Sequence, residues 1–486
     1  MILHKIFEHA RSAPQKLAIA YLGYRVSYGE FAYWIADARE FFAAQDLRAG
    51  GIAVLLAVPH RLDAWTLDFA LRSLGMNTVA VASPTDLRAL DLRDVCCVVT
   101  SIHEDPIPHL PAGSYKLFRI PQPLYLGKTA GTLPDRLDLA HPEGGHILLT
   151  SGTTGVRKMV LIGADFLAAM SARRGAVYGI NHQSMVDILD LALWTGAGYK
   201  LPLSTWLAGG TVIFHHNENF HHSLLIDGIT HAVVTPPKLS EILKAPDREL
   251  RFNPRLLLSV GGAPLSHQLA EAARTRLTPN VYTCLASTEV GIWGLTRIEG
   301  QDDLCAHQIH PSVEVQVVDE SDRPLAAGEM GAIRIRARDC VSGYFEDAAA
   351  TGQMFRDGYF YSGDIGEFRP DGRLVLHGRA SSVIIVRGTK LAAEPIERKL
   401  QERLQVRSAC VLSLPGNGSE DDVHLVLESN PTLPKSELAA VIGKELSGFP
   451  PVGVHFLQEM PRNDMGKIDR IILRQRVLTM PVSLIV

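Results

Sequence analysis

A short run of hydroxyl and glycine residues is the segment of this chain best suited to hold an anion. It reads LLTSGTTGVRKMV over residues 148–160, with apolar residues in front and Lys158 near its far end. Backbone N–H groups in a glycine-rich turn form a concave anion site, and hydroxyl groups add directed donors. Lys158 adds a mobile positive charge for phosphate oxygens. The segment lacks the spacing G-x-x-x-x-G-K-[ST] and therefore predicts a phosphate loop of another type.

Four further segments follow this loop along the chain. They are GGAPLS (261–266), ASTEVG (286–291), YSGDIGEFRPDGRLVLHGR (361–379) and PRNDMGKIDR (461–470). Together with TSGTTGVRK they resemble, in order and spacing, the motifs of the acyl-adenylate-forming (ANL) superfamily, which comprises acyl- and aryl-CoA ligases, amino-acid adenylation domains and luciferases. Five motifs in register over more than 300 residues exclude a chance agreement.

The resemblance implies a nucleotide site and assigns a contact to each motif. The implied nucleotide contacts are Thr150, Ser151, Gly152, Thr153, Thr154 and Lys158 on the β- and γ-phosphates, Gly262 and Ala263 against adenine, and Asp364 and Arg379 at the ribose hydroxyls. The same resemblance makes Thr288 a contact of the α-phosphate, Glu289 the ligand of Mg²⁺ and Lys467 the catalytic lysine. We expect Thr288, Glu289 and Lys467 to carry the catalysis.

The implied reaction brings two anions together. The carboxylate of an acid attacks the α-phosphorus of ATP, pyrophosphate leaves, and an acyl-AMP anhydride remains. The protein must therefore neutralise charge and align the reactants. A Mg²⁺ ion on Glu289 would offset phosphate charge. Lys467 would bridge the attacking carboxylate and an α-phosphate oxygen.

Several positions depart from the family pattern. Arg157 and Met159 replace a proline and a glycine of the phosphate loop, which removes no phosphate donor. Leu285 and Ala286 replace Tyr-Gly, so adenine would pack on an aliphatic face with a weaker stacking contribution. Ser381 stands where relatives have an Asp or Lys as the hinge between domains, and we assign it no hinge role.

The stretch DLALWTGAGYKLPLSTWLAGG, residues 190–210, indicates the class of acid. Trp194 falls where acyl- and aryl-CoA ligases place a residue that gates the carboxylate site, whereas amino-acid adenylation domains carry an Asp near Thr195 for the substrate ammonium group. This chain has no acidic residue there, which favours a carboxylic acid without an α-amine. The expected residues of the substrate pocket are Trp194, Gly262, Ala286 and Trp293.

The acceptor of the acyl group stays open between two thiols. We favour coenzyme A, and the alternative is the phosphopantetheine of an acyl or peptidyl carrier protein, because both present the same terminal arm. A second alternative is a nucleotide-binding protein without turnover, suggested by Leu285 and Ser381, although the presence of Lys467, Glu289 and Asp364 argues against it. The sequence fixes neither the acid nor the pathway nor the oligomeric state, and a homodimer is compatible with it.

Alternating strand and helix patterns predict the frame that positions these motifs. Apolar runs such as residues 51–59 and 145–151, separated by helical patterns, are typical of α/β layers. Alternating apolar and polar residues in three segments, 314–320, 331–337 and 373–379, predict antiparallel strands, which we expect to form a distorted β barrel. The expected fold is α/β, with a large N-terminal AMP-binding domain (1–379) and a small mobile α+β C-terminal domain (380–486) carrying Lys467. Catalysis then requires closure between the two.

The overall composition excludes several classes of function. A net charge of -4 over 486 residues gives no sign of a nucleic-acid or membrane-surface binder. No apolar run reaches the ~18 residues of a membrane span, and residues 1–18 have the pattern of an amphipathic helix rather than a secretory signal. The scattered cysteines include no CxxC pair, which fits a reducing compartment. We therefore expect a cytoplasmic protein.

Overall fold

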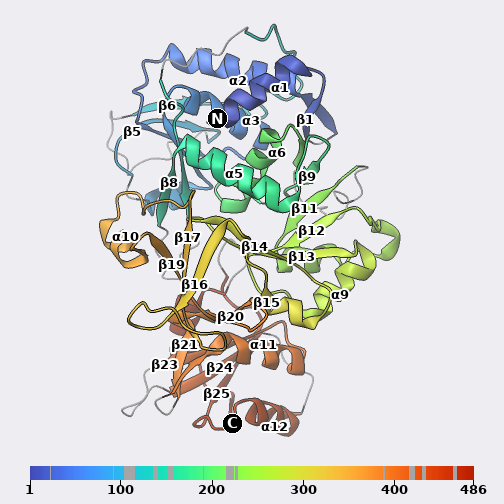
Figure 1. Cartoon of the computed structure of the whole chain (residues 1–486), viewed down its shortest axis with the longest axis vertical. Coiled ribbons are helices and arrows are strands. Elements are labelled where there is room, and N and C mark those ends of the chain that lie inside the picture. The colour runs from blue at the N-terminus through green and yellow to red at the C-terminus, as the bar shows by residue number, and fades with distance from the viewer. Residues whose placement is uncertain are drawn as a thin grey trace.

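The chain folds into an elongated molecule whose elements follow one another along its length. The computed structural model describes residues 1–21, 23–90, 92–102, 115–134, 141–150, 158–189, 191–214, 224, 228–386, 389–414, 422–428, 434–462 and 468–486. In Figure 1 the N-terminal helices α1 (Ile2–Ser12) and α2 (Tyr28–Ala43) lie at one end of the long axis, and α12 (Lys435–Glu445) lies at the other.

Two mostly parallel sheets form the N-terminal part. The first contains, in spatial order, β6 (Lys116–Arg119), β5 (Val95–Thr100), β3 (Ile52–Leu56), β4 (Asn77–Val81), β7 (His146–Leu149) and β8 (Met159–Ile162). The second contains, in spatial order, β14 (Gly291–Arg297), β13 (Asn280–Ser287), β12 (Leu257–Val260), β11 (His231–Val234), β9 (Met185–Asp187), β10 (Thr211–Phe214), β1 (Leu17–Tyr21) and β2 (Tyr24–Ser27). The pairs β7–β8, β13–β14 and β1–β2 are antiparallel hairpins at sheet edges. Two of these hairpins carry sequence motifs at their turns.

Helices lie between the two sheets and on their outer faces. Besides α1 and α2, they are α3 (Arg61–Ser73), α4 (Pro84–Arg88), α5 (Ala164–Tyr178), α6 (Gly196–Leu207), α8 (Pro236–Ile242) and α9 (His267–Arg276). The helix α2 begins where the sequence places Ser27 and Glu30, which form a reciprocal capping box. The helix α6 begins at Thr195, whose hydroxyl accepts a hydrogen bond from the N–H of Gly198 at 3.1 Å.

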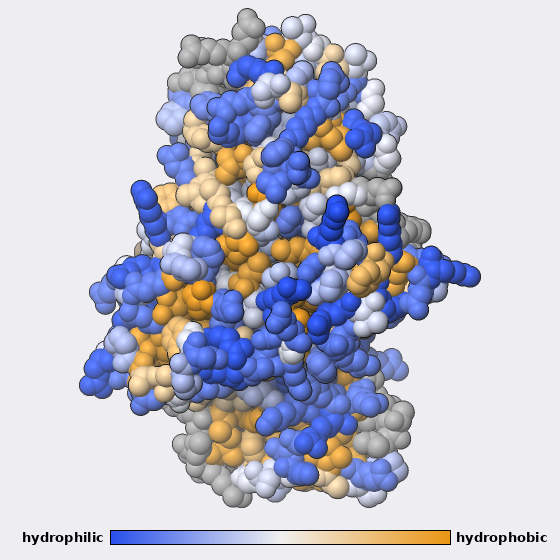
Figure 2. All heavy atoms as spheres, turned by 45° about the vertical axis from the view of Figure 1, so that its right-hand side comes forward, coloured by the Kyte–Doolittle hydropathy of each residue, from blue (hydrophilic) through white to orange (hydrophobic). Residues whose placement is uncertain are grey.

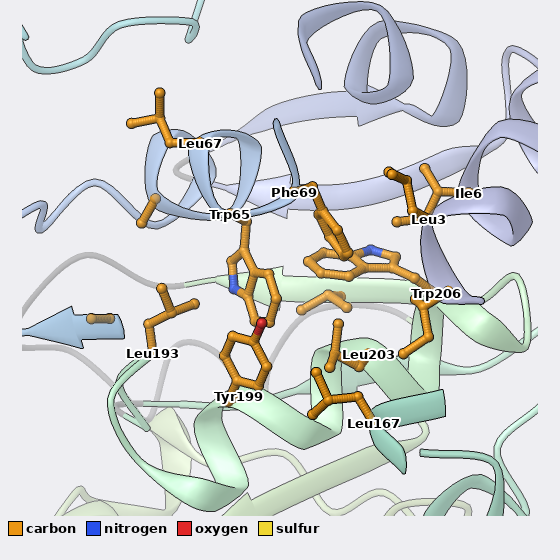
Figure 3. Close-up of a cluster of buried hydrophobic side chains, with 14 of the residues drawn as sticks. Leu3, Ile6, Trp65, Leu67, Phe69, Leu167, Leu193, Tyr199, Leu203 and Trp206 are labelled. Atoms are coloured by element: carbon orange, nitrogen blue, oxygen red, sulfur yellow. The ribbon is translucent and has the colours of Figure 1, made fainter. Parts of the chain in front are cut away.

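A cluster of aromatic rings packs α6 against α3. Trp65 of α3 stacks on Tyr199 of α6 with ring centroids 4.9 Å apart, and it meets Trp206 edge-on at 5.0 Å. Figure 3 shows these rings between the two helices, with Leu167 of α5 beneath them. Apolar residues of both sheets belong to the same hydrophobic cluster. The position of α6 is therefore set by packing from both sheets.

A curled antiparallel sheet follows the α/β layers. Its strands are, in spatial order, β15 (Ala306–His307), β20 (Leu374–Arg379), β19 (Tyr359–Phe368), β17 (Gly331–Ala337) and β16 (Val313–Val318), with β18 (Phe355–Arg356) on β19 and α10 (Ala348–Met354) before it. The antiparallel pairing predicted from the alternating pattern is confirmed. Within the described residues the path of strands does not close, so the sheet is a half-barrel.

The C-terminal part has a hydrophobic core of its own. It contains the hairpin β21 (Val383–Val386) and β22 (Thr389–Ala392), a sheet of β23 (Ser408–Leu414), β24 (Asp422–Glu428), β25 (Gly453–Leu457) and β26 (Leu484–Ile485), and the helices α11 (Ala393–Leu404), α12 and α13 (Arg470–Leu478). Two hydrophobic clusters consist only of residues from Ile384 onward. The predicted fold class is confirmed, whereas the boundary at residue 380 and the mobility of this part stay predictions.

The surface mixes polar and apolar side chains. On the face shown in Figure 2, hydrophilic residues cover most of the area and hydrophobic residues are exposed between them, chiefly across the middle of the molecule. Within the part of the chain that the structure describes, no helix has the length and apolar character needed to cross a bilayer.

A buried polar network connects α3, α6, β4 and β7. Asp68 accepts hydrogen bonds from Thr78 Oγ1 at 2.6 Å and from Tyr199 Oη at 2.8 Å, and His146 Nδ1 lies 3.1 Å from it. The guanidinium of Arg72 lies 3.5 Å from the Asp68 carboxylate. Burial alone would raise the pKa of Asp68, but His146, Arg72 and Thr78 outweigh it and hold that pKa below its usual range. The network thereby ties the strand in front of the phosphate loop to α6.

We predict that Asp68→Asn lowers the free energy of unfolding by about 3 kcal/mol or more, because it leaves the buried Arg72 charge without this partner. Urea unfolding followed by tryptophan fluorescence measures it, since Trp65 and Trp206 lie in the adjacent core. The exposed Asp165, in the first turn of α5, provides the control Asp165→Asn, with an expected loss below about 1 kcal/mol.

The same network predicts a direction for the pH dependence. Because the folded pKa of Asp68 is depressed, its stabilisation is present above about pH 4, the ordinary value for Asp, and is lost as the pH falls through the folded pKa. The wild-type protein should lose this contribution in acid, whereas Asp68→Asn has none to lose. Equal acid sensitivity of the two proteins would contradict the assignment.

Candidate functional site

The phosphate loop spans the turn of the β7–β8 hairpin. Thr150 and Lys158 close the loop at its base, since the N–H of Thr150 donates to Lys158 O at 2.9 Å and the N–H of Lys158 donates to Thr150 Oγ1 at 3.2 Å. The predicted phosphate contacts between these two residues, Ser151, Gly152, Thr153 and Thr154, lie outside the described residues. The structure therefore fixes both ends of the loop at one edge of the first sheet.

Thr288 and Glu289 lie at the tip of the β13–β14 hairpin. The strand β13 runs to Ser287 and β14 begins at Gly291, so the two residues sit in a tight turn. Gly291 has a φ of 81°, a left-handed conformation that favours glycine. The turn is further held by Ser287, whose Oγ accepts a hydrogen bond from the N–H of Val290 at 3.1 Å. A short antiparallel edge thus projects both predicted catalytic residues beyond the parallel strands.

Tyr344 brings the phosphate loop and this turn together. Its hydroxyl donates to Glu289 Oε1 at 2.8 Å, and Lys158 Nζ lies 4.7 Å from the centre of its ring. Burial and the neighbouring Glu289 raise the pKa of Tyr344, so its hydroxyl remains a donor at neutral pH. Lys158, from one sheet, and Glu289, from the other, therefore face the same aromatic ring.

Asp364 and Arg379 form a cross-strand pair on the half-barrel. They are directly opposite each other in β19 and β20, and Arg379 Nε lies 3.2 Å from Asp364 Oδ1. The guanidinium also donates to Ser362 O. The Asp364 carboxylate is partly exposed, so it has room to accept hydrogen bonds from a diol.

Gly262 and Ala263 follow the carboxyl end of β12. In open α/β sheets, ligands bind beyond the carboxyl ends of parallel strands, and this is where the two residues lie. Gly262 is exposed and has a φ of 89°, so glycine suits this turn. A backbone surface at this position is suited to a flat ring.

The predicted pocket residues divide between two environments. Trp194 is partly buried just before α6, and Ala286 is exposed on β13. Trp293 is 3% exposed and packs in the half-barrel core together with Leu285. The structure thus brings Trp293 and Trp194 into different hydrophobic clusters, and the pocket lined by all of them stays a prediction.

Lys467 lies outside the described residues, but its flanks are placed. Arg462 and Ile468 form a β-bridge at the base of the segment. Arg470, just after it, forms an ion pair with Glu397 of α11 at 2.7 Å. The segment that carries Lys467 is therefore anchored on the C-terminal part.

A glycine lies at the contact between the half-barrel and the C-terminal part. The N–H of Arg379 donates to Glu394 Oε1 at 3.2 Å. Gly378, with a φ of 132°, lies so close to the same carboxylate that a Cβ there would be 2.0 Å from Glu394 Oε2. A larger residue at position 378 would strain the backbone at this φ and displace the Glu394 carboxylate.

Lys200, which belongs to none of the sequence motifs, lies against the turn that holds the predicted catalytic residues Thr288 and Glu289. Its ammonium group donates to Thr288 O at 2.6 Å, and the residue is 1% exposed. Burial, with a smaller contribution from Arg174, lowers the pKa of Lys200 to about 7, although Glu289 opposes this shift. A signal was present in the sequence, since Lys200 is the only charged residue between Leu191 and Phe214.

Comparison with known proteins gives a consistent result. The family model described as AMP-binding enzyme matches residues 122–345. The chain is 29% identical over 363 residues to the salicylyl-CoA synthase / salicylate adenylyltransferase of a Streptomyces species, which covers 70% of this chain and 65% of that protein. It is 26% identical over 518 aligned positions to the salicyl-AMP ligase / salicyl-S-ArCP synthetase of Mycobacterium tuberculosis, which covers 98% of this chain and 90% of that protein. Six of the curated relatives, the first four among them, are matched over only 60 to 65% of their own length.

The fold is also that of a solved structure with bound nucleotide. ATP-bound MatB from Rhodopseudomonas palustris matches with a TM-score of 0.85 at 21% identity, over 98% of this chain and 99% of that chain. Because the ordered motifs, the architecture and these matches agree, the chain belongs to the AMP-binding (ANL) superfamily, which holds acyl- and aryl-CoA ligases and adenylation enzymes of peptide synthetases.

Proposed function

We propose that this protein activates a carboxylic acid without an α-amine by adenylation with ATP and then transfers the acyl group to the thiol of coenzyme A. The observation that carries the proposal is that Tyr344 contacts Lys158 through its ring and Glu289 through its hydroxyl. Through that residue, the predicted phosphate-binding lysine and the predicted magnesium ligand are held beside each other. Such a pair is suited to a magnesium-bound triphosphate.

The residues present fit ATP with Mg²⁺. No group of three or more His, Cys, Asp or Glu side chains able to hold a metal occurs among the described residues. This suits Mg²⁺, which commonly binds one or two carboxylates together with substrate phosphates and water. Tyr344 donates to Glu289 Oε1 and so fixes the orientation of the carboxylate that would hold the ion. The bound ion would supply charge neutralisation and polarise the phosphate.

The remaining contacts would orient the nucleotide. Asp364 would accept hydrogen bonds from the ribose hydroxyls, with Arg379 holding its carboxylate in place. Gly262 and Ala263 would present backbone to the adenine. Thr288 would donate its hydroxyl to an α-phosphate oxygen, at the atom where negative charge increases during attack. Lys467 would reach the same oxygen from the C-terminal part when the two parts close.

The N-terminus of α6 favours a substrate that carries a carboxylate and no ammonium group. A Cβ placed on Gly196 would lie 3.5 Å from Thr288 Oγ1, so the N-terminus of this helix lies beside the predicted site of attack. Helix N-termini favour negative charge. Asp187, an acidic residue upstream of α6, is buried and accepts a hydrogen bond from the N–H of Leu189 at 2.7 Å. These observations favour an acid without an ammonium group.

The relatives support both acceptors. The Streptomyces protein is named for a CoA product and the Mycobacterium protein for a carrier-protein product. We favour coenzyme A because the acyl- and aryl-CoA ligases share the aromatic or histidine position that Trp194 occupies. Loading of a carrier protein is the alternative.

The proposed substrate class predicts which acids react. Acids without an α-amine should drive exchange of labelled pyrophosphate into ATP, whereas the amino acids of the same skeleton should have a kcat/KM lower by about 10²-fold or more, because their ammonium group finds no partner. Matched pairs are 3-phenylpropionate with phenylalanine and 4-methylpentanoate with leucine, and salicylate serves as an aryl acid. Exchange driven by the amino acids would reject the substrate class. Exchange with none of the acids would favour nucleotide binding without turnover.

The second prediction concerns Lys467. Lys467→Ala should lower the rate of adenylation by about 10²- to 10³-fold, because a charged donor to the transition state is lost. Formation of thioester from supplied acyl-AMP and coenzyme A should retain most of its rate. Lys444→Ala, an exposed lysine of α12 on the same part of the chain, is the control. Equal loss in both half-reactions would contradict a role confined to adenylation. A pantetheinylated carrier in place of coenzyme A then identifies the acceptor.

A further inference from the structure

Three consecutive backbone carbonyls at the tip of the β13–β14 hairpin accept hydrogen bonds from outside the hairpin. Thr288 O accepts from Lys200 Nζ at 2.6 Å, and Glu289 O accepts from the N–H of Val341 at 3.1 Å. Val290 O accepts from the guanidinium of Arg173. A tight turn points these groups away from the ladder of its own strands, so external donors decide how they are oriented. The conformation of the catalytic turn therefore depends on its neighbours.

Two of the three donors are basic side chains that are buried. Lys200 comes from α6 and is 1% exposed, and the side chain of Arg173 comes from α5 and is 8% exposed. Arg173 also lies 3.1 Å from the carboxylate of Asp339. Burying a cation is costly unless it forms strong contacts, and an apolar residue of similar size would fill either position at lower cost. Simple packing therefore does not account for these two residues.

Charged groups surround Lys200. Among the described residues they include Arg173 and Arg174 of α5, Glu289 of the turn and Asp339 after β17. The two guanidinium groups face two carboxylates, and one of these carboxylates is the proposed magnesium ligand. Positive groups beside that carboxylate would lower the electrostatic cost of bringing two anionic reactants together.

The helix backbone at Lys200 is held in place by the contacts of its neighbours. The preceding residue, Tyr199, donates to Asp68 Oδ2 in the buried network at 2.8 Å and stacks on Trp65. One turn before Lys200, a Cβ placed on Gly196 would lie 3.5 Å from Thr288 Oγ1. The helix α6 therefore contacts the carbonyl of Thr288 and passes close to its hydroxyl.

We propose that Lys200 and Arg173 are positioning residues for adenylation: by fixing the carbonyls of Thr288 and Val290, they hold the Thr288 hydroxyl and the Glu289 carboxylate in place for the α-phosphate and Mg²⁺. The proposal rests on the proposed function above. Tyr344 fixes the side chain of Glu289, whereas Lys200 and Arg173 fix the backbone on either side of it. Both are needed because displacement of a reacting group by about 1 Å can cost about 10²-fold in rate.

The test compares Lys200→Met with Ser204→Ala. Methionine keeps the length and apolar stem of lysine and removes the ammonium group. Ser204 lies one turn further along α6 and is equally buried, and its hydroxyl donates to the carbonyl of Lys200 in its own helix at 2.8 Å. Lys200→Met should lower kcat for pyrophosphate exchange by about 10- to 100-fold. The Kd for ATP should change much less than kcat, because the interaction serves the transition state.

A second measurement does not depend on turnover. Hydrogen–deuterium exchange of the peptide covering residues 280–297 should accelerate in Lys200→Met and in Arg173→Met but not in Ser204→Ala, because an unsupported turn opens more often. Unchanged exchange in both substituted proteins, or an unchanged kcat in Lys200→Met, would overturn the proposal. So would an equal fall in adenylation and in thioester formation from supplied acyl-AMP, which indicates a general loss of folded enzyme.

The two hypotheses fail separately. If the wild-type protein shows no pyrophosphate exchange with any acid, the proposed function fails, and the hydrogen–deuterium measurement still decides whether Lys200 and Arg173 support the turn. If the wild-type protein is active and Lys200→Met matches it in kcat and in protection of the turn, only the positioning role is rejected.

Discussion

The proposed site depends on the conformation of one tight turn, Thr288–Val290, whose carbonyl groups point away from the ladder of its own strands. All of its carbonyl groups are satisfied by donors from elsewhere: α6, α5 and the segment after β17. A turn built in this way is as rigid as the elements around it. Helices α5 and α6 and the segment after β17 all contact this turn, so the packing of these elements determines where the side chains of Thr288 and Glu289 lie.

The helix α6 is connected both to the strand before the phosphate loop and to the Thr288–Val290 turn. Its Tyr199 joins the buried network that reaches His146 on β7, the strand that leads into the loop. Its Lys200, on the other side, contacts Thr288. Adjacent residues on a helix point in different directions, so one short segment connects both halves of the site. Tyr344 forms a second connection between the two, because it contacts both Lys158 at the end of the loop and Glu289 in the turn.

The sequence predicted the architecture better than the environment of single residues. The apolar strand β3 and the alternating strand β17 have unmistakable patterns, and both were expected. The strand β19 was read only as a motif, because Gly363, Asp364 and Gly366 are poor strand formers. Lys200 was missed because a lysine in a helix is ordinarily a surface residue, and only the three-dimensional packing shows that α6 is covered on all sides. The loop residues Ser151–Thr154 and Lys467 rest on the motifs alone.

The contact at Gly378 sets a limit on how the molecule can be assembled. A strand residue is usually judged by its fit within its own sheet, but here the neighbour that matters is Glu394, on the far side of the junction. A Cβ at residue 378 would come within 2.0 Å of a Glu394 carboxylate oxygen and would sit on a backbone with a φ of 132°. An added side chain would therefore strain the strand and push the Glu394 carboxylate away from the N–H of Arg379, so the cost would reach the residue that holds Asp364.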